Sequence, residues 1–434
     1  MSLLGGGGPK QFDEVPVLGV PSAERVAFVP RHGVGTQAVM LASATGIAQL
    51  IVAGMYIGAA RSASPAQFGF VVAAVAIGNA AVGFLDFGTN ALWVRELARG
   101  KLAQQRLGHA ALSKLLIGLA LGVLWVPLTF VLLPRSVYWI AAPIALALLA
   151  NQTMQVSLRG IGRADLVAWS ILTDRVIGGS VLTGLFLIGL PPFTTLWIAL
   201  SAGSMGAALM AWKLTPQAAR PIFRKFRFVN PWSGSHFYGL TGLATSAQSL
   251  DLAVMTAVGG PVIAGTYGAV NRWTQPLGLL VGAFSSASIP FVAQSSSWKD
   301  AWLHVRKGMW LPIAAILASI MVAAFSSPIV DVLIGPEYKN SASVLRILAL
   351  ATIPGIVNQP VSVFLQSMGL DRPVAIIMGA NVIIVLVLIA VFVPIAGAIG
   401  AAIAALVTQT AVAIALVLVA VGSRKHGTSR KGRS

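Results

Sequence analysis

A few charged side chains interrupt long apolar segments of this chain, and they are the residues that could do chemistry. Arg272 and Asp251 are the clearest, because each lies about a helix half-length inside a segment of mostly apolar residues. A charge at the centre of a membrane span costs roughly 2.5–3.5 kcal/mol on insertion scales, so such residues face a polar cavity or one another. A guanidinium in that position can bind an anion, and a carboxylate can exchange a cation.

Arg272 is followed four residues later by Pro276. Proline lacks the backbone N–H that would bond the Arg272 carbonyl, so we expect a kink with a free acceptor beside a cation. Asp251 reaches a similar depth across the short turn at 259–261. Two interpretations stay open: an ion pair between Asp251 and Arg272 that makes burial tolerable, or an anion site with a carboxylate that can change charge. We favour the second.

Asp174 and Arg175 form a second charged position, about ten residues into their segment and so roughly 15 Å deep at 1.5 Å per residue. Adjacent residues point about 100° apart on a helix. We therefore expect that the two side chains do not simply neutralise each other, and that one of them meets a partner from another span.

Polar stripes accompany these charges. Asn79, Gly83, Asp86 and Asn90 recur at intervals of four, three and four residues, which places them on one helix face. Similar stripes of amides and hydroxyls occur at Asn151/Gln152/Gln155/Arg159, Ser170/Thr173, Thr241/Thr245/Gln248, Asn271/Gln275 and Asn358/Gln359/Ser362/Gln366. A single uncharged residue of this kind often only holds membrane helices together, at about 0.6 kcal/mol. Several stripes together predict a polar, water-filled interior.

The candidate site follows from these patterns. Residues expected to line a substrate cavity are Arg272, Arg175, Asn271, Gln275, Asn79, Asn90 and Gln248. Residues expected to serve ion coupling are Asp251, Asp174 and Asp86. GxxxG spacings such as Gly54–Gly58 also occur, but 45 glycines make chance matches common.

The elements that position these residues are membrane helices. Of the 434 residues 56% are hydrophobic and only 10% charged, and mean hydropathy is +0.83. A span needs about 20 apolar residues. Twelve segments of that length are expected, at about 36–60, 68–94, 111–133, 137–158, 166–190, 193–212, 236–258, 262–289, 309–334, 342–368, 374–394 and 398–421.

The net charge of +18 is distributed by topology. Most Lys and Arg residues fall in alternate connections and in both tails, the positive-inside pattern for an even number of spans with both termini in the cytoplasm. The charge is thus explained without nucleic acid, and it favours anionic lipid headgroups. We expect a cytoplasmic arm at 1–34, a lobe at 35–212, a basic interlobe loop at 213–235, a second lobe at 236–421 and a basic tail at 422–434.

Several classes of chemistry are disfavoured. The absence of cysteine excludes disulfides, thiolate metal sites and cysteine nucleophiles. The five histidines are scattered at or near expected loops, and no phosphate-binding glycine loop or catalytic constellation stands out. We therefore expect no enzyme, no cofactor and no metal site.

A faint internal repeat supports a two-lobed architecture. Pro65–Gly69 precedes the second span and Pro261–Gly268 precedes the eighth, each a proline turn followed by an aromatic residue beside glycine. Parallel repeats six spans apart are used by transporters to build a central site between two lobes. The expected fold is an all-α polytopic membrane protein, with twelve transmembrane helices in two pseudo-repeated six-helix lobes around a central cavity.

Three segments resemble a known family. The stretch from Phe68-Gly69 through Leu85-Asp86-Phe87-Gly88 to Arg95-Glu96-Leu97-Ala98 looks like the second-span signature of the polysaccharide (O-antigen type) flippases. These belong to the multidrug/oligosaccharidyl-lipid/polysaccharide (MOP) superfamily. The segments 334–349 and 393–402 are similar to the family's tenth-span region and to its turn into the last span. The resemblance covers about residues 35–421, without the two further spans that lipid II flippases usually carry.

The resemblance implies a flippase that opens alternately to each side. The first, second, seventh and eighth spans would line a cationic cavity, with the cavity arginine role falling on Arg272. The cargo would be an undecaprenyl-pyrophosphate-linked oligosaccharide, moved from the inner to the outer leaflet of the bacterial cytoplasmic membrane. Coupling to H⁺ or Na⁺ stays open, because the membrane potential alone could bias export. Partners would be membrane lipids and a glycan polymerase or glycosyltransferases. Residue-level carry-over is confined to Asp86, Arg95 and Arg272.

Two other functions remain open from the sequence. A multidrug-type ion-coupled exporter of the same superfamily usually carries cations, which Arg175 and Arg272 should repel. A non-transporting membrane scaffold of an envelope assembly would use its basic tails and should not depend on its cavity charges.

Overall fold

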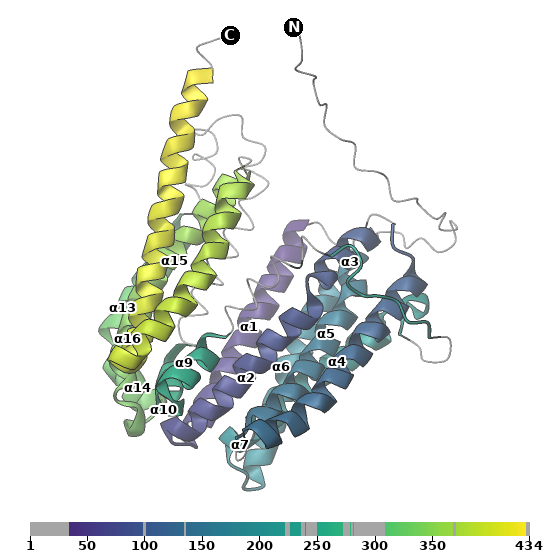
Figure 1. The fold of residues 1–434 in the computed structure, drawn as a ribbon, viewed down its shortest axis with the longest axis horizontal. Coiled ribbons are helices and arrows are strands. Elements are labelled where there is room, and N and C mark those ends of the chain that lie inside the picture. The colour runs from purple at the N-terminus through teal and green to yellow at the C-terminus, as the bar shows by residue number, and fades with distance from the viewer. Residues whose placement is uncertain are drawn as a thin grey trace.

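The computed structural model describes residues 34–98, 101–133, 136–221, 226–235, 250–271, 309–367 and 370–430, with the single residues Gly239, Gly278 and Val281. In this part of the chain the fold is helical, without strands. Figure 1 shows two groups of long helices that touch at one end and diverge toward the end where α1 begins and α16 ends. The all-α expectation is confirmed.

The first group is built from seven α-helices and two short 3₁₀ turns. Their bounds are α1 Val34–Arg61, α2 Pro65–Asp86, α3 Thr89–Ala98, α4 Gln104–Leu132, η2 Tyr138–Ile140, α5 Ala141–Gly160, α6 Ala164–Leu187, α7 Pro192–Leu214 and η3 Gln217–Ala219. Here α5 lies at the centre and packs on α7, α2, α3 and α4, while α1 packs chiefly on α6.

The second group contains α9 Asp251–Gly259, α10 Pro261–Asn271, α13 Trp310–Ala324, α14 Ser326–Leu333, η5 Pro336–Tyr338, α15 Ser341–Ser367 and α16 Asp371–Arg430. The 60-residue α16 is two helices that meet at Gly397, where φ is 59° and the backbone leaves the helical region. Val374 and Leu416 share one apolar cluster, so the two halves fold back on each other as a hairpin. Glycine permits this positive φ at little cost.

By length and composition, eight helices of the described residues can cross a membrane, or up to nine if the pair α13–α14, bent by 72°, forms one span. The sequence predicted twelve. Two reasons account for much of the difference: α16 counts once although it is a hairpin, and the predicted spans 236–258 and 262–289 lie largely outside the described residues. The count of twelve therefore stays a prediction.

Two predicted spans have different ends in the structure. The second was expected to run continuously through 68–94, but α2 ends at Asp86, and Phe87 and Gly88 adopt left-handed φ values of 42° and 71° before α3 begins. Left-handed backbone cannot continue a right-handed helix. The third was expected to begin at 111, whereas α4 begins at Gln104. Lys114 therefore lies ten residues into the helix rather than near its start.

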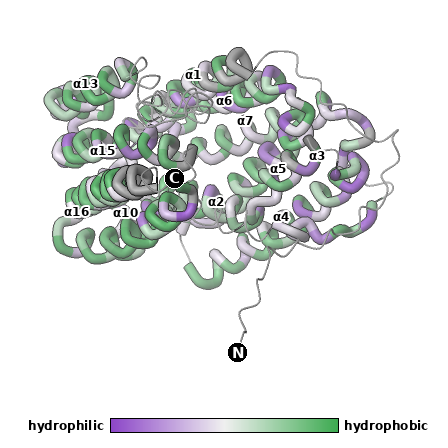
Figure 2. Tube along the Cα trace, turned by 90° about the horizontal axis from the view of Figure 1, so that it is seen from above, coloured by the Kyte–Doolittle hydropathy of each residue, from purple (hydrophilic) through white to green (hydrophobic). Residues whose placement is uncertain are grey.

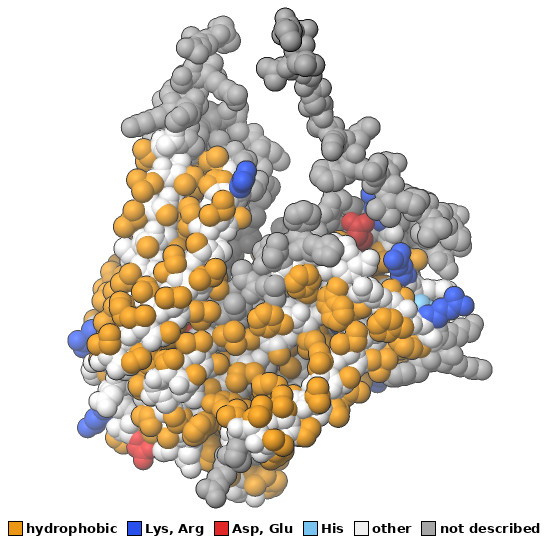
Figure 3. Space-filling model, in the orientation of Figure 1, with side chains coloured by type: hydrophobic (Ala, Val, Ile, Leu, Met, Phe, Trp, Pro, Cys, Tyr) orange, Lys and Arg blue, Asp and Glu red, His pale blue; other side chains and the backbone are white. Residues whose placement is uncertain are grey.

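Apolar side chains cover the outside of both groups. Figure 3 shows hydrophobic side chains over most of the visible surface, with the basic side chains near its two ends. Viewed from the end where the groups diverge, hydrophilic residues gather along α3 and α5 in the first group and are sparser along α16 (Figure 2). Polar groups facing inward and apolar groups facing outward are the arrangement required in lipid.

The two groups meet where the starts of α2 and α10 cross. Ser64 caps α2, accepting a hydrogen bond from the Gln67 backbone, and proline stands at the first helical position of each helix. A Cβ atom added at Gly69 would overlap the carbonyl oxygen of Pro261, and one added at Gly265 would overlap that of Pro65. The crossing is thus reciprocal, and it joins the two segments that suggested a repeat in the sequence.

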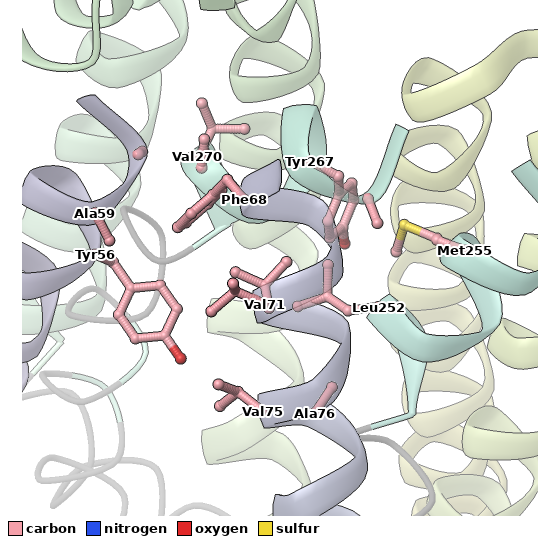
Figure 4. Close-up of a cluster of buried hydrophobic side chains, with 14 of the residues drawn as sticks. Tyr56, Ala59, Phe68, Val71, Val75, Ala76, Leu252, Met255, Tyr267 and Val270 are labelled. Atoms are coloured by element: carbon pink, nitrogen blue, oxygen red, sulfur yellow. The ribbon is translucent and has the colours of Figure 1, made fainter. Parts of the chain in front are cut away.

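Side chains around this crossing seal the same end. The rings of Tyr56 and Tyr338 pack edge-on against Phe68, with centroids 6.2 and 6.5 Å away. The Tyr338 hydroxyl donates to the Ala63 carbonyl at 3.2 Å, and burial, with the charge of Glu337, raises the pKa of this phenol above its usual range. Figure 4 shows Tyr56 and Phe68 with residues of α9 and α10 in one apolar cluster. We call this region the closed end.

The crossing predicts an effect of adding one methyl group. Gly69→Ala should force α2 and α10 apart, because the new Cβ meets backbone rather than a flexible side chain. Since the chain has no cysteine, a single Val72→Cys reporter beside α10 can measure accessibility to a maleimide. We expect labelling to rise several-fold in Gly69→Ala and in Gly265→Ala.

Gly54→Ala is the matched control, because a Cβ at Gly54 meets nothing within 4 Å. This substitution should leave the labelling rate unchanged. Equal labelling in all four backgrounds would show that the crossing does not hold the closed end together.

Candidate functional site

Asp174 of α6 is the most deeply buried carboxylate among the predicted site residues that the structure describes, with 5% of its surface exposed. Asn151 Nδ2 donates to its Oδ2 at 3.1 Å, and the Ser204 hydroxyl lies 3.3 Å from the same oxygen. These partners come from α5 and α7. The expectation that one of Asp174 and Arg175 meets a partner from another span is confirmed.

Arg175 also approaches Asp174, with Nη2 3.7 Å from Oδ2. The expectation that adjacent residues on a helix cannot neutralise each other is therefore wrong in part, since a long arginine side chain can bend back toward its neighbour. This distance is long for a charge-assisted hydrogen bond, in which nitrogen and oxygen are usually about 2.7–2.9 Å apart. Neutral donors provide the shorter contacts to the carboxylate.

A chain of amides leads away from Asp174 along α5. Gln155 Nε2 donates to Asn151 Oδ1 at 2.9 Å and to the Ser170 hydroxyl at 3.2 Å. At the far end Arg159 Nη2 donates to Gln155 Oε1 at 3.0 Å. Every step points the same way, so the donors run from Arg159 toward the carboxylate.

Asp86 and Asn90 belong to a different cluster, centred on Lys114 of α4. The Lys114 ammonium lies 2.9 Å from Asp86 Oδ1, 2.7 Å from Asn90 Oδ1 and 3.0 Å from the Thr89 hydroxyl. It also stands 4.4 Å from the centre of the Trp93 ring, a cation–π geometry. Lys114 is fully buried. This cluster fixes the break between α2 and α3, which gives Asp86 a structural explanation.

The remaining predicted residues are placed as follows. Asn79 is half-buried in the middle of α2, away from the Lys114 cluster. Asp251 begins α9, where its carboxylate accepts from the Leu252 backbone, and Asn271 is the last residue of α10. Arg272, Gln275 and Gln248 lie outside the described residues. The proposed Asp251–Arg272 relation therefore stays a prediction.

The second group contains a polar layer without a carboxylate. Asn358 Nδ2 of α15 donates to the backbone oxygen and to Oε1 of Gln409 in α16, both at 2.9 Å. Asn358 and Asn381 are 4% and 8% exposed. Within the described ranges their Oδ1 atoms have no hydrogen-bond partner.

Ser204 and Lys114 are site residues that sequence reasoning missed. Ser204 gave no signal, because a lone serine in a small-residue helix is common. Lys114 could have been found because it lies inside the expected span 111–133, directly before the apolar run that starts at Leu115. Among described residues, groups of three or more His, Asp or Glu side chains suited to a metal ion do not occur.

Comparison with known proteins supports a transporter architecture. Residues 242–392 match the MatE family. In structure the chain is similar to the lipid II flippase MurJ in an inward closed conformation, with a TM-score of 0.69 and 14% identity over 88% of this chain and 87% of that chain. No curated protein sequence matches it.

Two other solved structures are similar. One is an inward-facing multidrug resistance MATE family transporter of the MOP superfamily, with a TM-score of 0.56 and 16% identity over 93% of this chain and 97% of that chain. The other is a MOP superfamily transporter from Pyrococcus furiosus, at 0.52 and 16% over 88% and 94%. The fold is that of MATE-type transporters. With the apolar helices long enough to span a membrane, it indicates a multi-pass membrane protein.

The Lys114 cluster predicts a marked loss of stability in Lys114→Met. The substitution leaves the Asp86 carboxylate without its cation, and breaking a buried ion pair costs about 3–5 kcal/mol. Thermal unfolding in detergent should show a lower midpoint temperature, and the double variant Lys114→Met/Asp86→Asn should recover part of the lost stability.

Arg163→Gln is the control, because it breaks a more exposed pair, in which Arg163 Nη2 lies 2.8 Å from Asp165. Exposed pairs contribute about 0–1 kcal/mol. If Lys114→Met melted as the wild type does, the cluster would not hold the α2–α3 break.

Proposed function

We propose that this protein is a flippase that moves an undecaprenyl-pyrophosphate-linked oligosaccharide from the inner to the outer leaflet by alternating access. The observation that carries the proposal is a polar wall of the first group, formed by Asn151, Gln155 and Arg159 of α5 with Asp174 and Arg175 of α6, in which two arginines accompany one buried carboxylate. The wall therefore has an excess of positive charge. A pyrophosphate that crosses a lipid core needs such compensating cations, and guanidinium supplies a permanent charge with forked donors.

The distribution of basic residues supports an orientation for this cycle. Lys101 and Arg163 lie in connections, and Arg106 in the first turn of α4, at the diverging end of the first group, whereas Arg61 and Lys339 lie at the closed end. Under the positive-inside rule the diverging end faces the cytoplasm. The two groups then diverge toward the leaflet where a lipid-linked precursor is made, in a bacterial cytoplasmic membrane with both termini inside.

Export does not require an ion gradient as its driving force. Moving two negative charges from a negative interior to the outside gains about 2.3 kcal/mol per charge per 100 mV. Asp174 is nevertheless the carboxylate best placed to exchange H⁺ or Na⁺, because its close partners are neutral. Asp251 is the second candidate. Asp86 is the weakest of the three, since Lys114 already balances its charge.

A multidrug-type ion-coupled exporter is the alternative that the comparisons favour, because solved multidrug MATE structures share the fold. Such a protein would place its cargo in the same space between the groups. The excess of positive charge on the wall argues against a cationic cargo. Partners such as a glycan polymerase or glycosyltransferases belong to the flippase proposal.

Export of lipid-linked glycan in cells lacking the native transporter tests the proposal. Arg175→Ala and Arg272→Ala should each lower export at least tenfold and leave precursor on the inner leaflet, at equal membrane expression. Lys213→Gln is the matched control, since its side chain is exposed at the end of α7 and outside the wall. Undiminished export by both arginine variants would instead make the scaffold and drug-exporter functions preferable.

Ion coupling has its own test. In the double variant Asp174→Asn/Asp251→Asn, export should no longer respond to an imposed H⁺ or Na⁺ gradient, while the response to membrane potential should remain. Export that is still driven by an ion gradient in this variant would remove both carboxylates from the coupling role.

A further inference from the structure

The surface of α5 differs in kind from the lipid-facing surfaces of its neighbours. Its exposed residues are Gln152 and Arg159, which lie seven positions apart and therefore on one side of the helix. On α4, by contrast, the exposed side chains beyond the first turn, which holds Gln105 and Arg106, are apolar; they include Leu119, Leu121, Val123, Leu124, Leu128 and Phe130. Exposed polar side chains on a membrane helix mark a face toward water rather than toward lipid.

Arg159 stands at the diverging end of this face. The start of α5 follows Tyr138, whose carbonyl accepts from Trp125 near the closed end, and Arg159 is one residue before the end of the helix. Its contact is with the neutral Oε1 of Gln155. An amide oxygen orients a guanidinium without cancelling its charge, so Arg159 presents its remaining donors toward the wet face.

The amide chain connects Arg159 to Asp174, about 12 Å away along α5 at 1.5 Å per residue. Arg159 donates to Gln155, Gln155 to Asn151, and Asn151 to the carboxylate. A charged acceptor at the end of such a chain polarises each amide in turn. The Gln155 oxygen then becomes a stronger acceptor, and it holds the guanidinium more firmly.

We propose that Arg159 is an anion-binding residue for the pyrophosphate class of ligand, and that Gln155 and Asn151 couple its affinity to the charge of Asp174. The proposal rests on the proposed flippase function and names a substrate contact and a linkage within it. When a bound cation neutralises Asp174, the amides are less polarised and the Gln155 oxygen becomes a weaker acceptor. The Arg159 guanidinium is then held less firmly by Gln155 and can bind the anion. Loading is favoured while Asp174 is neutral, and unloading when its charge returns.

Linkage of this kind is reciprocal, so the anion must strengthen cation binding by the same factor. A purely through-space effect would act in the same direction, because removing a negative charge favours any anion. The two explanations differ in one respect. Only coupling through the amides requires Gln155.

Binding of inorganic pyrophosphate to the purified full chain in phosphatidylcholine nanodiscs tests the proposal by calorimetry. Arg159→Gln should weaken binding about tenfold. Asp174→Asn should strengthen it about fivefold in the wild-type background, and that gain should vanish in a Gln155→Met background. If Gln155→Met does not fold, the double variant Gln155→Met/Ser170→Ala serves instead, because it replaces both members of the Gln155–Ser170 hydrogen bond.

Gln152→Leu is the matched control, because it changes an exposed amide of the same face outside the amide chain. It should leave both the affinity and the effect of Asp174→Asn unaltered. Unchanged affinity in Arg159→Gln would overturn the anion site, and an effect of Asp174→Asn that persists with Gln155→Met would overturn the coupling. Both results can occur while Arg175 and Arg272 variants still lose export, so they are distinct from failure of the flippase function.

Discussion

The contact between two glycines is the constraint on which the rest of the structure depends. At Gly69 and Gly265 the helices α2 and α10 approach backbone to backbone, each glycine lying against the carbonyl of the other helix's first proline. With the groups held so closely at one end, straight helices must separate toward the other. Interfaces packed to this density have discrete alternative arrangements rather than continuous ones.

Two carboxylates of the first group, the half-buried Asp86 and the buried Asp174, show how environment sets what a carboxylate can do. Asp86 meets an ammonium at 2.9 Å, and that pair holds a helix break in place. Asp174 is served mainly by an amide and a hydroxyl, which stabilise a charge without opposing it. A carboxylate paired with a fixed cation resists neutralisation, whereas one solvated by neutral donors can accept a proton or a metal cation. Sequence position alone gave both residues the same role.

Much of the fold could be predicted, because lipid imposes a simple rule on composition. Long apolar segments, basic connections and the Pro–Gly segments before the second and eighth spans indicated a two-lobed helical bundle. The break at Phe87-Gly88 was not foreseen, since a single glycine in an apolar run is ambiguous between helix and turn. The burial of Lys114 was missed for a related reason, as the helix begins seven residues earlier than hydropathy suggested.

The candidate site was predicted less completely. The depth of Asp174 followed from counting residues, but its pairing with Asn151, 23 positions earlier, depends on how α5 and α6 pack. Helix spacing finds neighbours on one helix and is silent about neighbours on another. The Arg159–Gln155–Asn151 stripe was visible in the sequence, and only the structure turned it into an ordered chain of donors and acceptors.

The polar layer of the second group differs in chemistry from the matching layer of the first group. Asn151, Gln155 and Asp174 recur 207 positions later as Asn358, Ser362 and Asn381. The two sets occupy matching helices, yet the later copy has an amide where the earlier one has an acid. At these positions the first half therefore holds a group that can gain and lose charge, and the second half holds neutral amides and a hydroxyl. A change of charge at this layer can act on the first half alone.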